Sequence, residues 1–149
     1  IALAESTDFD WDELFDGVNW FHWTGINPAL FDNMVQICER FGCKKVAITL
    51  RESINASHNG WSGMLYDVMG NVNYSTHYNI DIVDQVGGDD SFTGAMIYSL
   101  ITGKDNKDAI KFAVAASCLK HSMEGDFNRV TVSDVENLIK NGGNGRVQH

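Results

Sequence analysis

The residues with the clearest chemical potential in this sequence are two glycines followed by two aspartates, at positions 87–90. A short expected strand, Asp81–Val83, ends just before them, and a helical pattern of apolar residues begins at about Asp90. Glycines let the backbone approach a ligand closely, and the first N–H groups of a helix have no partner within the helix. Together with the helix dipole, this arrangement predicts a site for an anion such as a phosphate.

Asp90 falls in the first turn of the expected helix, where its carboxylate can point at the anion site. A carboxylate there could accept a proton from a substrate hydroxyl as that hydroxyl attacks a phosphoryl group. The structural alternative is an aspartate that caps a helix after a glycine turn, and an isolated pattern of this kind favours that alternative.

Length and charge limit the classes of protein and ligand. The 149 residues suit one compact domain, and the net charge of -9 argues against a nucleic-acid or anionic-membrane partner. An anionic substrate would need local positive charge or backbone N–H donors. Cys38, Cys43 and Cys118 form no metal-binding spacing, so we expect reduced thiols, no zinc site and a cytoplasmic location. The apolar runs are too short to span a membrane, and no leader segment is evident.

The pattern of apolar residues predicts an α/β fold, a sheet layered with helices. The expected strands are 18–25, 45–50, 64–69, 72–78 and 81–83, with a hairpin across Gly70-Asn71. The expected helices are a short amphipathic helix or turn within 8–17, then 31–41, a helix from Asp90 to a stop at Gly103, and 106–120. A last helix should open with a capping box at Ser133 and end near Gly142. A polar loop is expected from Arg51 to Gly63.

Residues 86–92 resemble the GAGD signature of the ribokinase family of sugar kinases. Further stretches are similar to one branch of that family, the 2-keto-3-deoxygluconate kinases. These stretches are 20–26 with 28–30, 46–53, 120–122 through 125–128, and the tail 145–148. The resemblance covers nearly all of the chain, and its motifs are specific at the level of the family.

The resemblance implies phosphorylation of a sugar-acid hydroxyl by ATP, assisted by Mg²⁺, with 2-keto-3-deoxygluconate as the expected acceptor. Asp90 would be the catalytic base, and the backbone N–H groups of Gly87, Gly88, Asp89 and Asp90 would stabilise the transferring phosphoryl group. Asp126 would reach the acceptor sugar. The implied nucleotide-binding residues are Thr49, Leu50 and Arg51 near the phosphates, and Ala113, Ala116, Ser117 and Lys120 near the adenine.

Each of these residues also has an ordinary structural explanation. Thr49 can be a plain strand residue, and Arg51 can form a solvated ion pair with Glu52. Lys120 ends a helix, where a cation is favoured by the dipole, and Asp126 follows a glycine as turn residues do.

Two features depart from the family pattern. Asp89 stands where relatives usually have glycine, and a carboxylate ~4 Å from a phosphate costs about 1 to 4 kcal/mol. In addition, the chain (1–149) corresponds to the C-terminal, ATP-binding part of a ribokinase-like domain, so the N-terminal part and the β lid are expected to be missing. A further missing stretch is expected near residues 30–31.

Three interpretations follow from the sequence. The first is a sugar kinase represented by a partial chain, a possible homo-oligomer as relatives often are. The second is a non-catalytic remnant that binds nucleotide or a partner. The third is an unrelated α/β module in which residues 87–90 only cap a helix, which the additional matching stretches disfavour.

Overall fold

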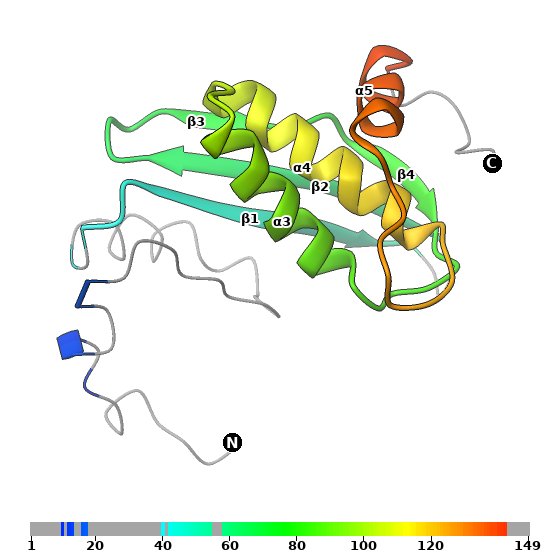
Figure 1. Ribbon diagram of the computed structural model, residues 1–149, viewed down its shortest axis with the longest axis horizontal. Helices are drawn as coiled ribbons and strands as arrows, with labels where there is room; N and C mark the ends of the chain where they lie inside the picture. The colour runs from blue at the N-terminus through cyan, green and yellow to red at the C-terminus, as the bar shows by residue number, and fades with distance from the viewer. Residues whose placement is uncertain are drawn as a thin grey trace.

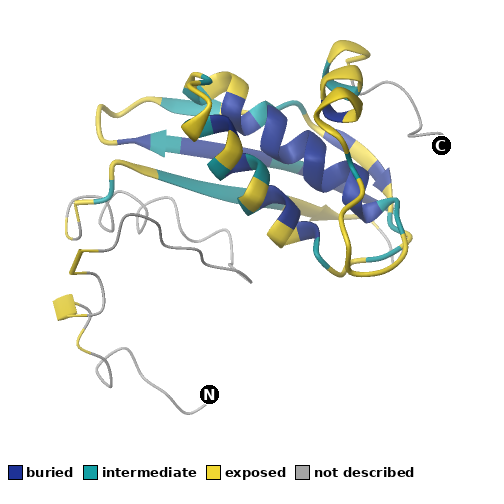
Figure 2. Cartoon of the chain, in the orientation of Figure 1, coloured by how far each residue is buried: buried dark blue, intermediate teal, exposed yellow. Residues whose placement is uncertain are grey.

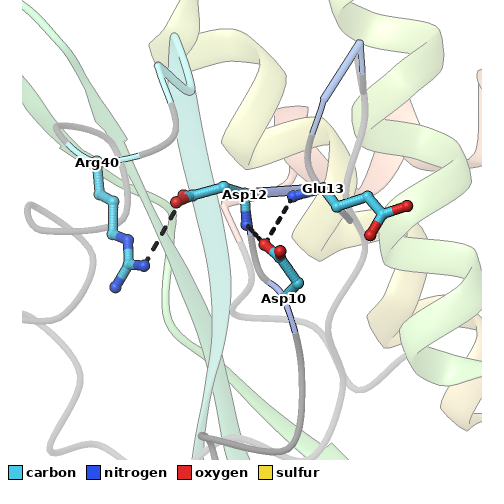
Figure 3. A network of polar contacts seen from close by, with 4 residues as sticks. All are labelled: Asp10, Asp12, Glu13 and Arg40. Carbon is cyan, nitrogen blue, oxygen red and sulfur yellow. Dashed lines mark hydrogen bonds and ion pairs between the residues drawn. The ribbon is translucent and has the colours of Figure 1, made fainter.

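The computed structural model describes residues 10, 12–13, 16–17, 40, 42–54 and 58–142. The expected strand 18–25, nearly all of the expected helix 31–41 and the expected gap near residues 30–31 lie outside these residues. Near the N-terminus, Asp10 Oδ1 accepts hydrogen bonds from the backbone N–H groups of Asp12 (3.2 Å) and Glu13 (3.1 Å) (Figure 3). Arg40 lies 3.8 Å from the Asp12 carboxylate. An aspartate that accepts from the N–H groups two and three residues later is typical of the start of a helical turn. This agrees with the short helix or turn expected within residues 8–17.

Four strands form one antiparallel sheet with β2 at its centre (Figure 1). β1 pairs with β2 along its whole length, and β3 and β4 share the opposite edge of β2. The strands are β1 (Lys45–Ser53), β2 (His58–Asp67), β3 (Val72–Tyr74) and β4 (Tyr78–Asp81). The expected strand 45–50 and the hairpin across Gly70-Asn71 are therefore confirmed. The expected strand 72–78 is divided, because β3 ends at Tyr74.

The expected polar loop from Arg51 to Gly63 is wrong. Its first residues extend β1 and its last residues begin β2. The glycines that suggested a loop instead allow close packing: a Cβ atom at Gly63 would lie 2.7 Å from Val114 Cγ2. A helix therefore lies directly on the strand at this point, which is a known reason for glycine within a sheet.

Three helices follow the sheet: α3 (Gly88–Ile101), α4 (Asn106–His121) and α5 (Val132–Lys140). α4 lies against the sheet, with α3 and α5 packed beside it (Figure 1). Figure 2 shows α4 buried over almost its full length, and its apolar residues make up much of the core. Among the described helices, none combines the length and apolar character needed to cross a membrane.

The last helix begins differently from the sequence prediction. Its capping box is formed by Thr131 and Asp134, not by Ser133 and Glu136. Thr131 Oγ1 accepts from the Asp134 backbone N–H at 3.2 Å, and Asp134 Oδ2 accepts from the Thr131 N–H at 2.9 Å. Thr131 has the extended backbone that a cap requires, whereas Ser133 already lies within the helix.

We predict that Thr131→Ala lowers the free energy of unfolding by about 1 kcal/mol, because it removes the oxygen that caps α5. The matched control is Ser133→Ala, which changes a hydroxyl residue of the same helix turn and should shift the free energy by less than about 0.5 kcal/mol. Urea denaturation of both variants checks this, and equal losses would contradict the assignment of the cap.

Candidate functional site

The turn before α3 has the conformation that only glycine adopts easily. Gly87 is the N-cap of α3 with φ 75° and ψ 4°, in the left-handed region, and no side chain caps the helix. A Cβ atom at Gly87 would lie 3.1 Å from the Asp126 carbonyl oxygen. The first N–H groups of α3 therefore follow a turn with no side-chain oxygen to satisfy them, and Asp89 and Asp90 stand exposed in that first turn.

The C-terminal end of α4 packs against this turn. A Cβ atom at Gly88 would lie 2.4 Å from His121 Cε1, so the imidazole ring covers the backbone directly. Ser117 Oγ donates a hydrogen bond of 2.8 Å to the Gly88 carbonyl oxygen. These contacts require a residue without a side chain at position 88, which accounts for the second glycine.

His121 is held as a neutral ring. Its Nδ1 donates a hydrogen bond of 2.7 Å to the Ser117 carbonyl oxygen, and its ring centroid lies 4.6 Å from that of Trp61. Burial lowers the pKa of His121, while the bond to Ser117 and the charge of Asp89 act in the opposite direction. The net shift is downward, so at neutral pH His121 supports the turn without adding positive charge.

The loop 122–131, between α4 and α5, runs beside the segment that leads into α3 (Figure 1). Hydrogen bonds join the loop to this segment and to α3 at two points. Asp84 accepts from the N–H of Val86 at 2.9 Å and from the N–H of Gly125 at 3.0 Å. These two bonds, in that order, lower the pKa of Asp84, and the charge of Lys120 adds to the effect. At the second point, Asn128 Nδ2 donates to Ser91 Oγ at 2.7 Å. The turn and the loop therefore hold each other in place.

A cleft of about 440 Å³ lies between the loop and the helices. It begins at Gly87 and Asp90 and follows one face of α3 as far as Tyr98. Asp126 from the loop shares the cleft with Asp90, and aromatic rings from Tyr98, Phe112 and Phe127 also line it. One end of the cleft thus contains the exposed start of α3 and two carboxylates, and the rest of the cleft is largely apolar.

The structure brings some of the sequence-predicted site residues together. Gly87, Asp90, Ala116 and Asp126 line the cleft, and Gly88 lies buried behind it. Asp89 is exposed in the same helix turn but does not line the cleft. These positions agree with a shared site, while the chemical role of each residue stays a prediction.

The other predicted residues lie outside the cleft lining. Ala113, Ser117 and Lys120 are buried in α4, so their side chains are covered by protein. Thr49, Leu50 and Arg51 lie on β1. Arg51 is the strand partner of Trp61, whose ring contacts His121. This end of β1 is therefore linked to the Gly87 turn through the rings of Trp61 and His121.

Sequence reasoning missed the residues that hold the turn in place and one that lines the cleft. Asp84 and Asn128 act through bonds to backbone and hydroxyl groups that are distant in sequence. Phe127 lines the cleft with 84% of its surface exposed, which is unusual for a phenylalanine. The sequence does offer a signal, since Phe127 and Asn128 directly follow the predicted Asp126, but their contacts depend on the fold.

Comparison with known proteins relates this geometry to a family. Residues 59–130 match the pfkB family of carbohydrate kinases. A 2-dehydro-3-deoxygalactonokinase from Haloferax volcanii is 33% identical over 83 residues, which cover 56% of this chain and 26% of that protein. The crystal structure of a 2-dehydro-3-deoxygluconokinase from Thermotoga maritima is 38% identical with a TM-score of 0.71, covering 87% of this chain and 40% of that one.

A second crystal structure, of a PfkB family carbohydrate kinase from Listeria grayi, is 30% identical with a TM-score of 0.70 and covers 77% of this chain. The chain spans less than half the length of each of these relatives. The family match runs from β2 through the Gly87 turn, α3 and α4 to the end of the loop that lines the cleft. Residues 59–130 therefore match part of a pfkB family carbohydrate kinase domain, and the described fold agrees with the ribokinase-like fold expected from the sequence.

Proposed function

We propose that this protein is a kinase that transfers the γ-phosphoryl group of ATP to a hydroxyl of a small sugar acid, with 2-keto-3-deoxygluconate as the first candidate acceptor and its 6-phosphate as the product. The match of residues 59–130 to the pfkB family of carbohydrate kinases supports a carbohydrate acceptor. The 38% identity to a protein named 2-dehydro-3-deoxygluconokinase supports this choice of sugar acid.

The observation that carries the proposal is the position of Asp90 beside the Gly87 turn, at one end of the cleft. In the proposed reaction, the N–H groups at the start of α3 bind the γ-phosphoryl oxygens. A sugar hydroxyl oxygen then forms a bond to phosphorus while the bond to the leaving ADP oxygen breaks. Asp90, exposed at the same place, accepts the hydroxyl proton.

The two carboxylates of the cleft also suggest how the acceptor is oriented. Asp90 and Asp126 both line the cleft and can accept hydrogen bonds from hydroxyl groups. They would repel the carboxylate of a sugar acid. The acceptor therefore presents its hydroxyl end to these aspartates and keeps its carboxylate away, as transfer to the 6-hydroxyl of the proposed substrate requires.

The remaining phosphates of the nucleotide and its metal ion are assigned to the end of β1 that is linked to the turn. We place the ATP phosphates near Thr49, Leu50 and Arg51, where Arg51 supplies positive charge in an acidic chain. Within the described residues, no group of three or more histidine, cysteine or acidic side chains could hold a metal ion. Independently of that search, we propose that Mg²⁺ enters with ATP as part of the substrate, bound mainly by phosphate oxygens and water.

A second candidate function is nucleotide binding without turnover. Its supporting observation is Asp89, a second exposed carboxylate in the first turn of α3, close to where the phosphoryl group would bind.

The free thiols of Cys43 and Cys118 fit a reducing compartment, so for either function we propose a cytoplasmic location.

We predict that Asp90→Asn lowers kcat by about 10² to 10⁴-fold, because asparagine keeps the shape but cannot accept the proton. The affinity for ATP·Mg²⁺ should change by less than about three-fold, since the base acts in the transition state. A coupled ADP-release assay with 2-keto-3-deoxygluconate and isothermal titration with ATP·Mg²⁺ measure the two effects.

The matched control for this prediction is Asp108→Asn, which makes the same change in the first turn of α4, outside the cleft. It should keep the wild-type kcat. Full activity of Asp90→Asn would show that another group is the base.

Removing the second carboxylate distinguishes the two candidate functions. We predict that Asp89→Gly raises kcat/KM for ATP by about five-fold or more, because it removes a negative charge near the bound phosphates. Asp89→Asn is the companion variant: it removes the charge but keeps a side chain, so it should give most of the same gain. The steady-state assay above measures both, and an unchanged or lower kcat/KM would contradict the repulsion argument.

A further inference from the structure

Lys120 is the largest side chain that is fully buried in the described part of the chain. Lysine is almost never fully buried unless its charge is paired. The hydrogen bond found for its ammonium is a long contact of 3.5 Å from Nζ to the Met123 carbonyl oxygen. Removing a charged ammonium from water lowers the stability of the fold unless the charge is well paired. The burial of Lys120 therefore calls for a reason beyond packing.

The position of Lys120 is directly behind the Gly87 turn. A Cβ atom at Gly87 would lie 3.3 Å from Lys120 Cε, so the lysine stem packs against the glycine backbone. The charge of Lys120 also acts on Asp84, the carboxylate that bonds the N–H groups of Val86 and Gly125. The lysine stem therefore packs against the turn, and its charge acts on the residue that ties the turn to the loop.

The charges around the turn explain why a cation is useful there. Asp89 and Asp90 are exposed in the first turn of α3, Asp126 lines the cleft, and Asp84 lies just before the turn. An anionic ligand would meet all four carboxylates, which repel it. His121, the other titratable group packed against the turn from α4, has a lowered pKa and does not offset them at neutral pH.

Stability alone does not account for a lysine here. Replacing a buried charge by an apolar side chain of similar volume is often neutral or stabilising, because the cost of removing the ammonium from water disappears. Residues that lower stability in this way are typical of functional sites.

We propose that Lys120 is a positioning residue for phosphoryl transfer, which acts from behind the Gly87 turn without touching the ligand. Its charge holds Asp84, and through Asp84 the loop at Gly125, and it adds positive potential to the N–H groups at the start of α3. This rests on the proposed function of that turn, and it replaces the expectation that Lys120 lines the adenine pocket.

The test is Lys120→Met in the intact protein, because methionine approximates the lysine stem and removes the charge. We expect an unchanged or higher Tm, with the affinity for ATP·Mg²⁺ lowered about ten-fold or more. A loss of this size corresponds to one unit charge about 10 Å from an anion at an effective dielectric constant of about 20. We also expect kcat to fall, since a displaced turn stabilises the transferring group less well.

Two further variants make the test specific. Lys111→Met removes a lysine from the same helix away from the cleft, and it should leave ATP affinity and kcat unchanged. Asp84→Asn removes the partner charge. If Lys120 works through Asp84, the double variant should lose less activity than the product of the two single losses.

If the wild type is active and Lys120→Met keeps the same ATP affinity and kcat, the role of Lys120 is overturned. The proposed function is not affected by that result. A wild type that neither binds ATP nor turns over would overturn both this inference and the proposed function. If Lys120→Met fails to fold, Asp84→Asn decides: a folded variant with reduced ATP affinity supports the inference, and one with unchanged affinity and kcat overturns it.

Discussion

The candidate site depends on one backbone conformation, the left-handed turn at Gly87. The Asp126 carbonyl and the Lys120 stem leave no free space for a side chain at Gly87, and the His121 ring leaves none at Gly88. The segment that follows β4 ends at this turn, and α3 begins there. The first N–H groups of α3 are left without a capping side chain. A change that filled either position would move the helix start, and with it Asp90, away from the cleft.

Close packing carries this constraint from the turn back to the sheet. Val114 of α4 lies on Gly63 of β2, which fixes the helix on the centre of the sheet. Trp61, two residues before Gly63, contacts the His121 ring, and that ring covers Gly88. The strand β2 thus sets the place of α4, and the last turn of α4 sets the place of the catalytic candidate on α3.

Local pattern was sufficient for the elements whose signals are local. The apolar run of β1, the hairpin at Gly70 and the periodic residues of α4 were predicted correctly. The expected loop from Arg51 to Gly63 failed because Gly63 makes room for α4 on the strand, which no local pattern reveals. The glycine–aspartate motif is contiguous and so was found, whereas Asp84, Asn128 and the burial of Lys120 depend on contacts between segments about 30 to 40 residues apart.

A phosphate site at this turn requires enough positive potential to offset the nearby carboxylates. Four carboxylates and the buried ammonium of Lys120 surround a helix start whose dipole favours an anion. The most direct measurement is a crystal structure of the intact protein with a non-hydrolysable ATP analogue and Mg²⁺. The account predicts γ-phosphate oxygens about 3 Å from the backbone nitrogens of Gly88, Asp89 or Asp90. A γ-phosphate bound elsewhere, with the start of α3 free of ligand, would contradict it.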